Sequence, residues 1–256
     1  MNLVGECVSA ARRVSIERLP LTGFLALALG ASAFGGEGPG PAPIASSTGR
    51  PPAIQPAVHP KAMGFEEIVF VKRKPYSSDH YYTDINNGTS PDRFLPDNGI
   101  YIYSLRTRSE RPVVRSADMP GGNGFIGKIS LSFDAKKLLF DFRQDPAAGF
   151  RVWEVNTDGT GLRQVSFPPP DETEKAARWH AGWHTDDIHP CYLPDGDIIF
   201  CSTRSEHTVL CGGSSHLVAP GLYRMKADGT QVRPLANSPV SEFCPVVLDD
   251  GRVMYH

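Results

Sequence analysis

Two stretches of the chain decide its fold, HPCYLPDGDIIFCSTR at residues 189–204 and GLYRMKADGTQVRPLA at residues 221–236. Each holds two strand-like runs separated by an Asp-Gly pair, at 195–196 in the first stretch and at 228–229 in the second. Asp-Gly pairs readily form the tight turns that join antiparallel strands. The two stretches therefore predict two consecutive β-hairpins.

The same unit recurs along the chain. FDAKKLLFD, LPDGDIIFC and LDDGRVMYH, which begin at residues 133, 193 and 248, align without gaps. VWEVNTDGTGLRQV at 152–165 aligns in the same way with LYRMKADGTQVRPL at 222–235. Two further strands are predicted earlier in the chain, at EEIVFVKR and GIYIYSL. The aligned segments recur at intervals of 55 to 70 residues. Repeats of about this length with four strands in each are typical of β-propeller blades.

We therefore predict an all-β propeller of four-stranded antiparallel blades. About three blades are accounted for, whereas a propeller needs about four or more to close. We expect the propeller to be incomplete and the chain to be truncated at its C-terminus, because an unclosed sheet leaves an unpaired edge.

The composition agrees with this prediction. Glycine (25 residues) and proline (23 residues) are frequent in the 256-residue chain, as expected for many short strands joined by turns. The formal net charge of −2, without a basic stripe, argues against a nucleic-acid partner.

The first 33 residues have the pattern of a secretory signal peptide. Arginines precede the apolar run LTGFLALALGASAF, and Ala31-Ser32-Ala33 supplies a small-x-small cleavage site. An uncleaved anchor is the alternative, although the run is short for a membrane span, and no later segment could cross a bilayer. Residues 34–63 are predicted to be a disordered Pro/Gly-rich tether, and residues 64–256 the propeller domain. We expect a periplasmic or extracellular protein.

The hairpin sequences resemble those of a known family. HPCYLPDGDIIFCSTR, GLYRMKADGTQVRPLANS and CPVVLDDGRVMYH look like blades of TolB-type, WD-repeat-like propellers. More narrowly, they resemble the middle region of the hydrazine synthase alpha subunit in a family of exported bacterial proteins. The resemblance covers roughly residues 65–256 and implies a propeller fold. It does not carry over haem-dependent activity, because the chain has no C-x-x-C-H motif.

The two faces of the predicted propeller differ in their loops. If the strands of a blade are called A to D, the A–B and C–D turns share one face and the B–C and D–A loops share the other. All the tight turns belong to the first kind, and the long segments 74–98, 168–188 and 205–220 belong to the second. We call the second face the long-loop face, and expect it to bind a ligand or partner. Its candidate residues are His80, Tyr81, Tyr82, Trp179, Trp183, His207 and His216.

The segment RWHAGWHTDDIHP is the densest group of potential metal ligands. Imidazole and carboxylate groups suit zinc and other first-row metals. His180 and His184 would share a helix face if KAARWHAGWH formed a helical turn. In the alternative interpretation, the tryptophans pack the segment down and the histidines form hydrogen bonds or face water. The candidate metal ligands are His180, His184, His189 and Asp186.

Asp186 and Asp187 are adjacent and would point to opposite faces of an extended segment, which argues against a shared acid/base site. We expect turn or solvated carboxylates there.

Cleavage of the signal peptide would leave four cysteines. Cys201 ends a strand and Cys211 lies in the following loop, so a disulfide between them is one expectation. Cys191 and Cys244 lie near the A strands of successive blades. They could be buried as small apolar side chains, or they could form a second disulfide with each other. A catalytic thiol is not indicated, because no basic cluster or helix N-terminus lies nearby in the sequence.

Two classes of function remain. The favoured one is a non-enzymatic exported propeller whose long-loop face binds a protein, polysaccharide or redox partner. The alternative is a propeller module of a larger haem- or metal-dependent redox enzyme. CGGSSH at 211–216 matches neither a phosphate-binding loop nor the G-x-S-x-G motif of hydrolases, and the sequence identifies no cofactor.

Overall fold

The structure is a computed structural model, and it describes residues 64–73, 96–179, 183–208, 218–238 and 240–256. The expected signal peptide and tether lie outside this part. So do six of the candidate site residues, His80, Tyr81, Tyr82, His180, Cys211 and His216.

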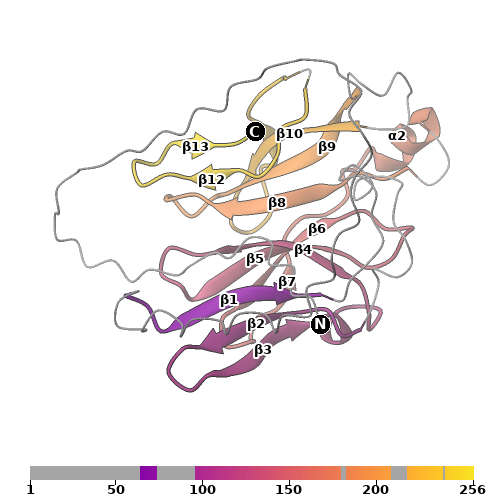
Figure 1. Ribbon diagram of the computed structural model, residues 1–256. Helices are drawn as coiled ribbons and strands as arrows, with labels where there is room; N and C mark the ends of the chain where they lie inside the picture. Colours follow the sequence, from indigo (N-terminus) through magenta and orange to yellow (C-terminus); the bar gives the residue numbers. More distant parts are fainter. Residues whose placement is uncertain (1–63, 74–95, 180–182, 209–217, 239) are drawn as a thin grey trace, which may run out of the picture.

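The described residues form four antiparallel sheets that follow one another along the chain (Figure 1). The first contains β1 (Glu67–Lys72), β2 (Gly99–Ser104) and β3 (Ser109–Arg115). The second contains β4 (Phe125–Leu131), β5 (Lys137–Arg143), β6 (Arg151–Asn156) and β7 (Arg163–Gln164). The third contains β8 (Asp187–Tyr192), β9 (Ile198–Thr208), β10 (Val218–Met225) and β11 (Arg233–Pro234). The last contains β12 (Val246–Val247) and β13 (Val253–Met254).

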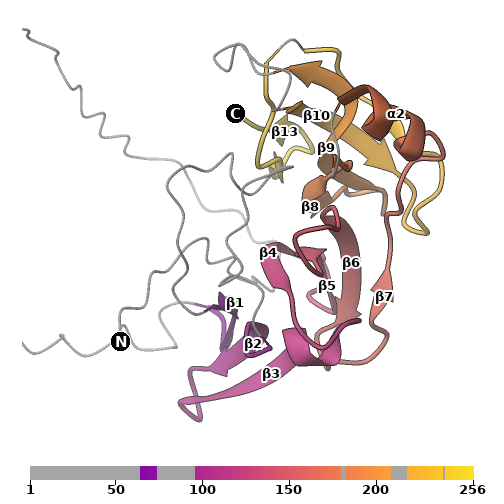
Figure 2. The same cartoon turned by 90° about the vertical axis from the view of Figure 1, so that its right-hand side faces the viewer.

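These sheets are the predicted propeller blades. In the second and third sheets the strand order follows the chain, β4-β5-β6-β7 and β8-β9-β10-β11, as in a meander of hairpins. The sheets are arranged in an arc, with the A strands β4 and β8 next to each other (Figure 2). The prediction of four-stranded antiparallel blades is confirmed, and the described residues form an incomplete propeller.

The Asp-Gly turns lie where the sequence places them, and in each the glycine takes the left-handed conformation. The φ angles of Gly196, Gly229 and Gly251 are 87°, 86° and 84°. In the first turn, Gly196 N–H donates to the carbonyl of Leu193, and Leu193 N–H donates to that of Asp197. This is the three-residue hairpin loop with glycine at the left-handed position, which a residue with a Cβ adopts only with strain.

Apolar side chains pack between neighbouring blades rather than inside one sheet. For example, Leu139 and Val152 of the second blade share a cluster with Ile198 and Phe200 of the third. Because a blade is covered on both faces, its central strands are buried on both sides, and six consecutive residues of β5 (138–143) are buried. Each fully buried Leu, Ile or Phe stabilises the fold by about 1.5–3 kcal/mol.

The long-loop face carries two short helical elements, η3 (Ser116–Asp118) and α2 (Glu172–Trp179). Helix α2 lies in the D–A connection between the second and third blades, beside one end of the third sheet (Figure 1). His184 lies outside this helix, in the extended segment that leads to β8, so the condition that it belongs to a helical turn is not met. Among the described residues, no helix combines the length and the apolar character needed to cross a membrane.

Candidate functional site: a cavity on the long-loop face

A cavity of about 280 Å³ opens on the long-loop face. It lies between the B–C loop of the second blade, residues 144–150, and the connection that carries α2. Strands β5, β6 and β7 complete its walls. The side chains that give it chemical character are Gln144, Arg151, Trp153, Gln164, Glu172 and His184.

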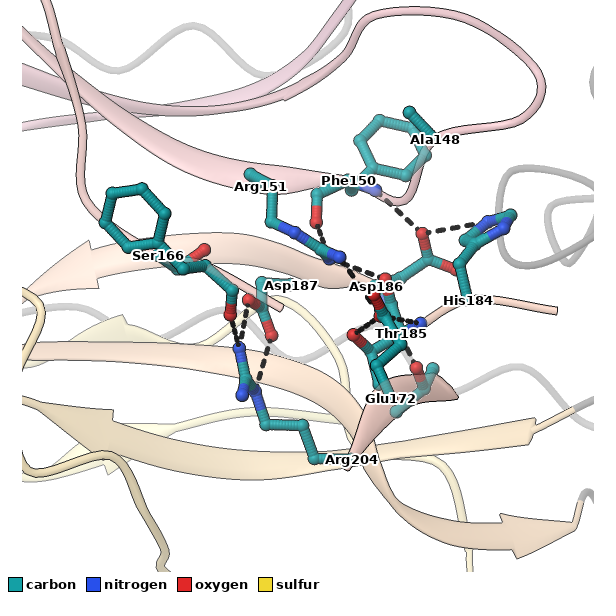
Figure 3. A network of polar contacts seen from close by, with 12 residues as sticks. Ala148, Phe150, Arg151, Ser166, Glu172, His184, Thr185, Asp186, Asp187 and Arg204 are labelled. Carbon is teal, nitrogen blue, oxygen red and sulfur yellow. Dashed lines mark hydrogen bonds and ion pairs between the residues drawn. The ribbon is translucent and has the colours of Figure 1, made fainter. Parts of the chain in front are cut away.

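Arg151 and Glu172 form a closed ion pair at the wall of the cavity (Figure 3). Arg151 Nη2 lies 3.1 Å from Glu172 Oε1, and Nη1 donates to the carbonyls of Thr185 at 2.6 Å and Phe150 at 2.8 Å. The same Glu172 oxygen accepts the main-chain N–H of Thr185 at 2.7 Å and also its hydroxyl group. The pair joins the first turn of α2 to β6. Because the two charges neutralise each other, it adds no net charge to the cavity.

Asp186 anchors the segment behind the cavity. Its Oδ1 atom accepts the main-chain N–H of Phe150 at 2.8 Å and lies 3.6 Å from Nε2 of His184 (Figure 3). The main-chain N–H of Asp186 donates to Thr203 Oγ1 at 2.8 Å. Asp186 therefore connects the last residue of the B–C loop, strand β9 and the cavity residue His184.

Asp187 points to the opposite side and pairs with Arg204. Arg204 Nε and Nη2 lie 3.0 and 2.7 Å from the two carboxylate oxygens, and the Ser202 hydroxyl donates at 2.7 Å. The two aspartates thus point apart, as expected, but the expectation of turn or solvated carboxylates is wrong, since both residues are 0% exposed and neither lies in a turn. Each carboxylate accepts hydrogen bonds, and Asp187 has a bidentate cation, which offsets the cost of burial.

His189 lies apart from His184 and Asp186, in contact with the fourth blade. Its main-chain N–H donates to Asp141 at 2.7 Å, and its ring packs against Phe243 with the ring centroids 5.7 Å apart. Burial, aided by the charge of Lys128, lowers the pKa of His189 to about 3. The imidazole is therefore neutral at ordinary pH.

The expected metal ligands are thus divided between two regions. Within the described part of the chain, no group of three or more His, Cys, Asp or Glu side chains could hold a metal ion. His180 lies outside that part, so a metal site built on it stays a prediction.

Three of the candidate residues of the long-loop face, Trp179, Trp183 and His207, are described, and each contacts another side chain of the chain. The rings of Trp179 and Trp183 stack with centroids 5.9 Å apart, and Trp179 Nε1 donates to Glu206 at 2.9 Å. His207 Nε2 lies 2.8 Å from the side-chain oxygen of Asn237. These contacts agree with the alternative interpretation, in which the tryptophans hold the segment against the third blade.

Among the described cysteines, Cys191, Cys201 and Cys244, no disulfide is formed. The Cys191 thiol donates to the carbonyl of Tyr192 at 3.6 Å, whereas Cys244 Sγ lies 3.7 Å from His189 Nδ1. Of the two alternatives for Cys191 and Cys244, the bridge is therefore not formed in the structure. The expected Cys201–Cys211 bridge involves a residue outside the described part.

Arg151, Glu172 and Arg204 were not among the site residues predicted from the sequence. The signal that could have found Arg151 is a charged side chain on a strand between apolar neighbours, as in FRVWEV, whereas Arg204 has polar neighbours in STRS. A buried charge needs a partner, so such a residue predicts an ion pair even though the partner itself is not evident.

No family model matches the chain, and no curated protein is detectably similar to it in sequence. Solved structures are similar in fold. Hydrazine synthase of Kuenenia stuttgartiensis is 16% identical, with a TM-score of 0.51 over 74% of this chain and 27% of that chain. TolB from Acinetobacter baumannii is 17% identical, with a TM-score of 0.44 over 74% of this chain and 34% of that one. An oligogalacturonate lyase in complex with manganese is 15% identical, with a TM-score of 0.43 over 73% and 42%.

The chain spans less than half of the length of each of these structures. At such low identities a structural likeness reports on fold and not on activity. The resemblance seen in the hairpin sequences is therefore confirmed for the fold alone. Together, the strand order of the blades and the likeness to the hydrazine synthase structure show that this chain has a β-propeller fold.

Proposed function

We propose that this chain is an exported binding module that holds one unit of a polysaccharide in the cavity on its long-loop face. The observation that carries the proposal is the make-up of the cavity, whose lining combines Trp153 with Gln144 and Gln164. The only charged groups in its lining, Arg151 and Glu172, already neutralise each other, and His184 is the remaining titratable group. A sugar offers hydroxyl groups to amides and an apolar ring face to an aromatic side chain, and it needs no countercharge.

The size and the support of the cavity agree with this occupant. Small-molecule sites usually enclose about 300–1,000 Å³, so a cavity of about 280 Å³ suits a single sugar unit of a longer chain. The loop above it is wrapped around the buried Arg143 guanidinium, which donates to the carbonyls of Ala148 at 2.7 Å and Pro146 at 2.8 Å. A preformed wall of this kind reduces the entropy lost on binding.

Export, which the N-terminal sequence predicts, is part of the proposal, because it would bring the module to polysaccharides outside the cytoplasm. A protein partner on the same face is the competing occupant. The net charge of −2 continues to argue against nucleic acid.

The test introduces a tryptophan on each of the two faces and compares the binding of glycans by the two variants. Ala147 lines the cavity and is exposed, and Ala227 is an exposed residue of the C–D turn in the third blade. Ala147→Trp should fill the cavity mouth, whereas Ala227→Trp adds the same ring to the opposite face. The full chain and both variants are screened on an array of neutral and acidic glycans, and hits are measured by titration calorimetry.

We expect a neutral glycan to bind the parent chain and Ala227→Trp equally, and Ala147→Trp to bind at least about tenfold more weakly, or about 1.4 kcal/mol. Equal affinity of the two variants would refute the cavity as the binding site. Absence of any glycan hit with the folded parent chain would refute saccharide binding.

A further inference from the structure

One pair of positions in neighbouring blades occurs twice with different residues. Asp141 on β5 and Cys201 on β9 occupy equivalent positions in the aligned segments FDAKKLLFD and LPDGDIIFC. Their partners in the next blade, His189 and Cys244, are also equivalent, since they are separated by the same 55 residues as LPDGDIIFC and LDDGRVMYH. Both partners have a left-handed backbone, with φ angles of 54° and 52°.

In the first pair, Asp141 accepts hydrogen bonds from main-chain N–H groups. The pairing of β8 with β9 is irregular between Ile188 and Cys191, and the main-chain N–H of His189 in that interval donates instead to Asp141 Oδ2 at 2.7 Å. The other oxygen of Asp141 accepts the N–H of Lys128, at a similar irregularity of β4, at 3.0 Å. A carboxylate thus satisfies main-chain donors that the sheets leave unpaired.

In the second copy both side chains are cysteines. The main-chain N–H of Cys244, the equivalent of His189 N–H, donates to His189 Nδ1 at 3.3 Å. Cys244 also lies close enough to Cys201 to affect the pKa of its thiol. A thiol sulfur is a much weaker acceptor than a carboxylate. Cys201 therefore cannot hold the next blade as firmly as Asp141 does, but its position places it beside the residue that carries the other cysteine.

The surroundings of Cys201 favour Cys244 over Cys191 as its disulfide partner. Cys201 belongs to an apolar cluster between the third and fourth blades, and both Cys244 and Cys191 pack against that cluster. The Cys191 thiol is directed to the carbonyl of its own neighbour, Tyr192. The Cys244 sulfur lies 3.7 Å from Nδ1 of His189, a residue of the third blade like Cys201.

We infer that Cys201 and Cys244 form a disulfide that joins the third blade to the fourth when the protein meets a low-molecular-weight disulfide such as glutathione disulfide. Cys244 is half-buried and Cys201 is 0% exposed, so Cys244 reacts first. Its thiolate attacks one sulfur of glutathione disulfide, breaks that S–S bond and releases one glutathione thiolate.

Cys201 then completes the exchange. Its thiolate attacks the Cys244 sulfur of the mixed disulfide and expels the second glutathione. Both thiol protons end on the two glutathione molecules, and two electrons pass from the cysteines to the glutathione disulfide. Burial raises the pKa of the Cys201 thiol, so this second step is the slow one.

The experiment maps the bridge in the folded full chain. The protein is incubated with mixtures of glutathione and glutathione disulfide, its remaining thiols are alkylated, and it is digested with trypsin without reduction. Trypsin yields peptides 179–204 and 227–252, which contain Cys201 and Cys244 respectively. Mass spectrometry is expected to find these two peptides linked, and a reductant is expected to separate them.

Variants identify the cysteine within the first peptide, which also contains Cys191. Cys191→Ser should keep the link and Cys201→Ser should lose it. The inference is overturned if Cys244 is linked to any other cysteine, if the link persists in Cys201→Ser, or if the oxidised parent chain has no link at Cys244. Because the parent chain and Cys191→Ser decide the outcome by themselves, the result does not depend on the folding of Cys201→Ser.

Discussion

The Asp187–Arg204 pair should be the ion pair on which the stability of the third blade depends most. With Nη2 and Oδ2 2.7 Å apart, the attraction between the two charges is about 6 kcal/mol at an effective dielectric constant of 20. Desolvation of the two groups offsets part of this value. Removal of one partner from a buried pair costs about 3–5 kcal/mol, because the other charge stays buried. We expect Arg204→Met to lower the free energy of unfolding by that amount, since Asp187 is 0% exposed.

The matched control is Arg252→Met. Arg252 pairs with Asp250 at 2.7 Å, a similar distance, but the two side chains are 77% and 52% exposed. Such a pair is worth less than about 1 kcal/mol. Urea unfolding followed by tryptophan fluorescence gives both values from the midpoint and the slope.

A double variant separates the loss of attraction from the cost of a buried, unpaired charge. Asp187→Leu combined with Arg204→Met removes both charges, so it should regain most of the stability that Arg204→Met loses. The reasoning is refuted if Arg204→Met costs no more than Arg252→Met. It is refuted equally if the double variant is no more stable than Arg204→Met.

Two further predictions concern pH and loop packing. Desolvation raises the pKa of Asp141 to about 6, against the lowering effect of its main-chain hydrogen bonds, so the folded state keeps a proton that the unfolded state releases near pH 4. The stability contributed by this group should therefore fall by up to about 3 kcal/mol as the pH rises from about 4 to 6. The drop should be missing from the pH profile of Asp141→Asn, and an identical profile would contradict the assignment. In Gly149→Ala the new Cβ would lie 2.0 Å from the Thr185 carbonyl oxygen, which should cost about 1–3 kcal/mol. Gly221→Ala, whose Cβ would meet nothing closer than 3.6 Å, should change the urea midpoint little, and equal effects of the two variants would show that the contact is absent.

The blades could be predicted because their determinants are local. An Asp-Gly turn needs only that glycine adopt a positive φ, as Gly196 and Gly229 do, and a hairpin then brings its own neighbouring segments together. Repetition of the unit specified the number of strands in a blade and the assignment of loops to faces. The sequence also showed that residues 168–188 are an insertion on the long-loop face, where α2 and the cavity are found.

The cavity and the polar contacts could not be predicted in this way, because their partners lie far apart in the chain. Glu172 reaches Arg151 only after the D–A connection has folded back over the second blade. Asp186 and Asp187 were expected to be turn or solvated carboxylates, whereas the folded structure buries both.

The sequence by itself therefore determined the blade, its turns and the face that carries the long loops, since these depend on backbone conformations within a few residues. Only the tertiary structure decided which charges are buried together and which cysteines meet. Cys201 and Cys244 lie in different blades, and no local pattern specifies how one blade rests on the next. That arrangement depends on the packing of apolar side chains between blades, a collective property of residues distributed over the whole chain.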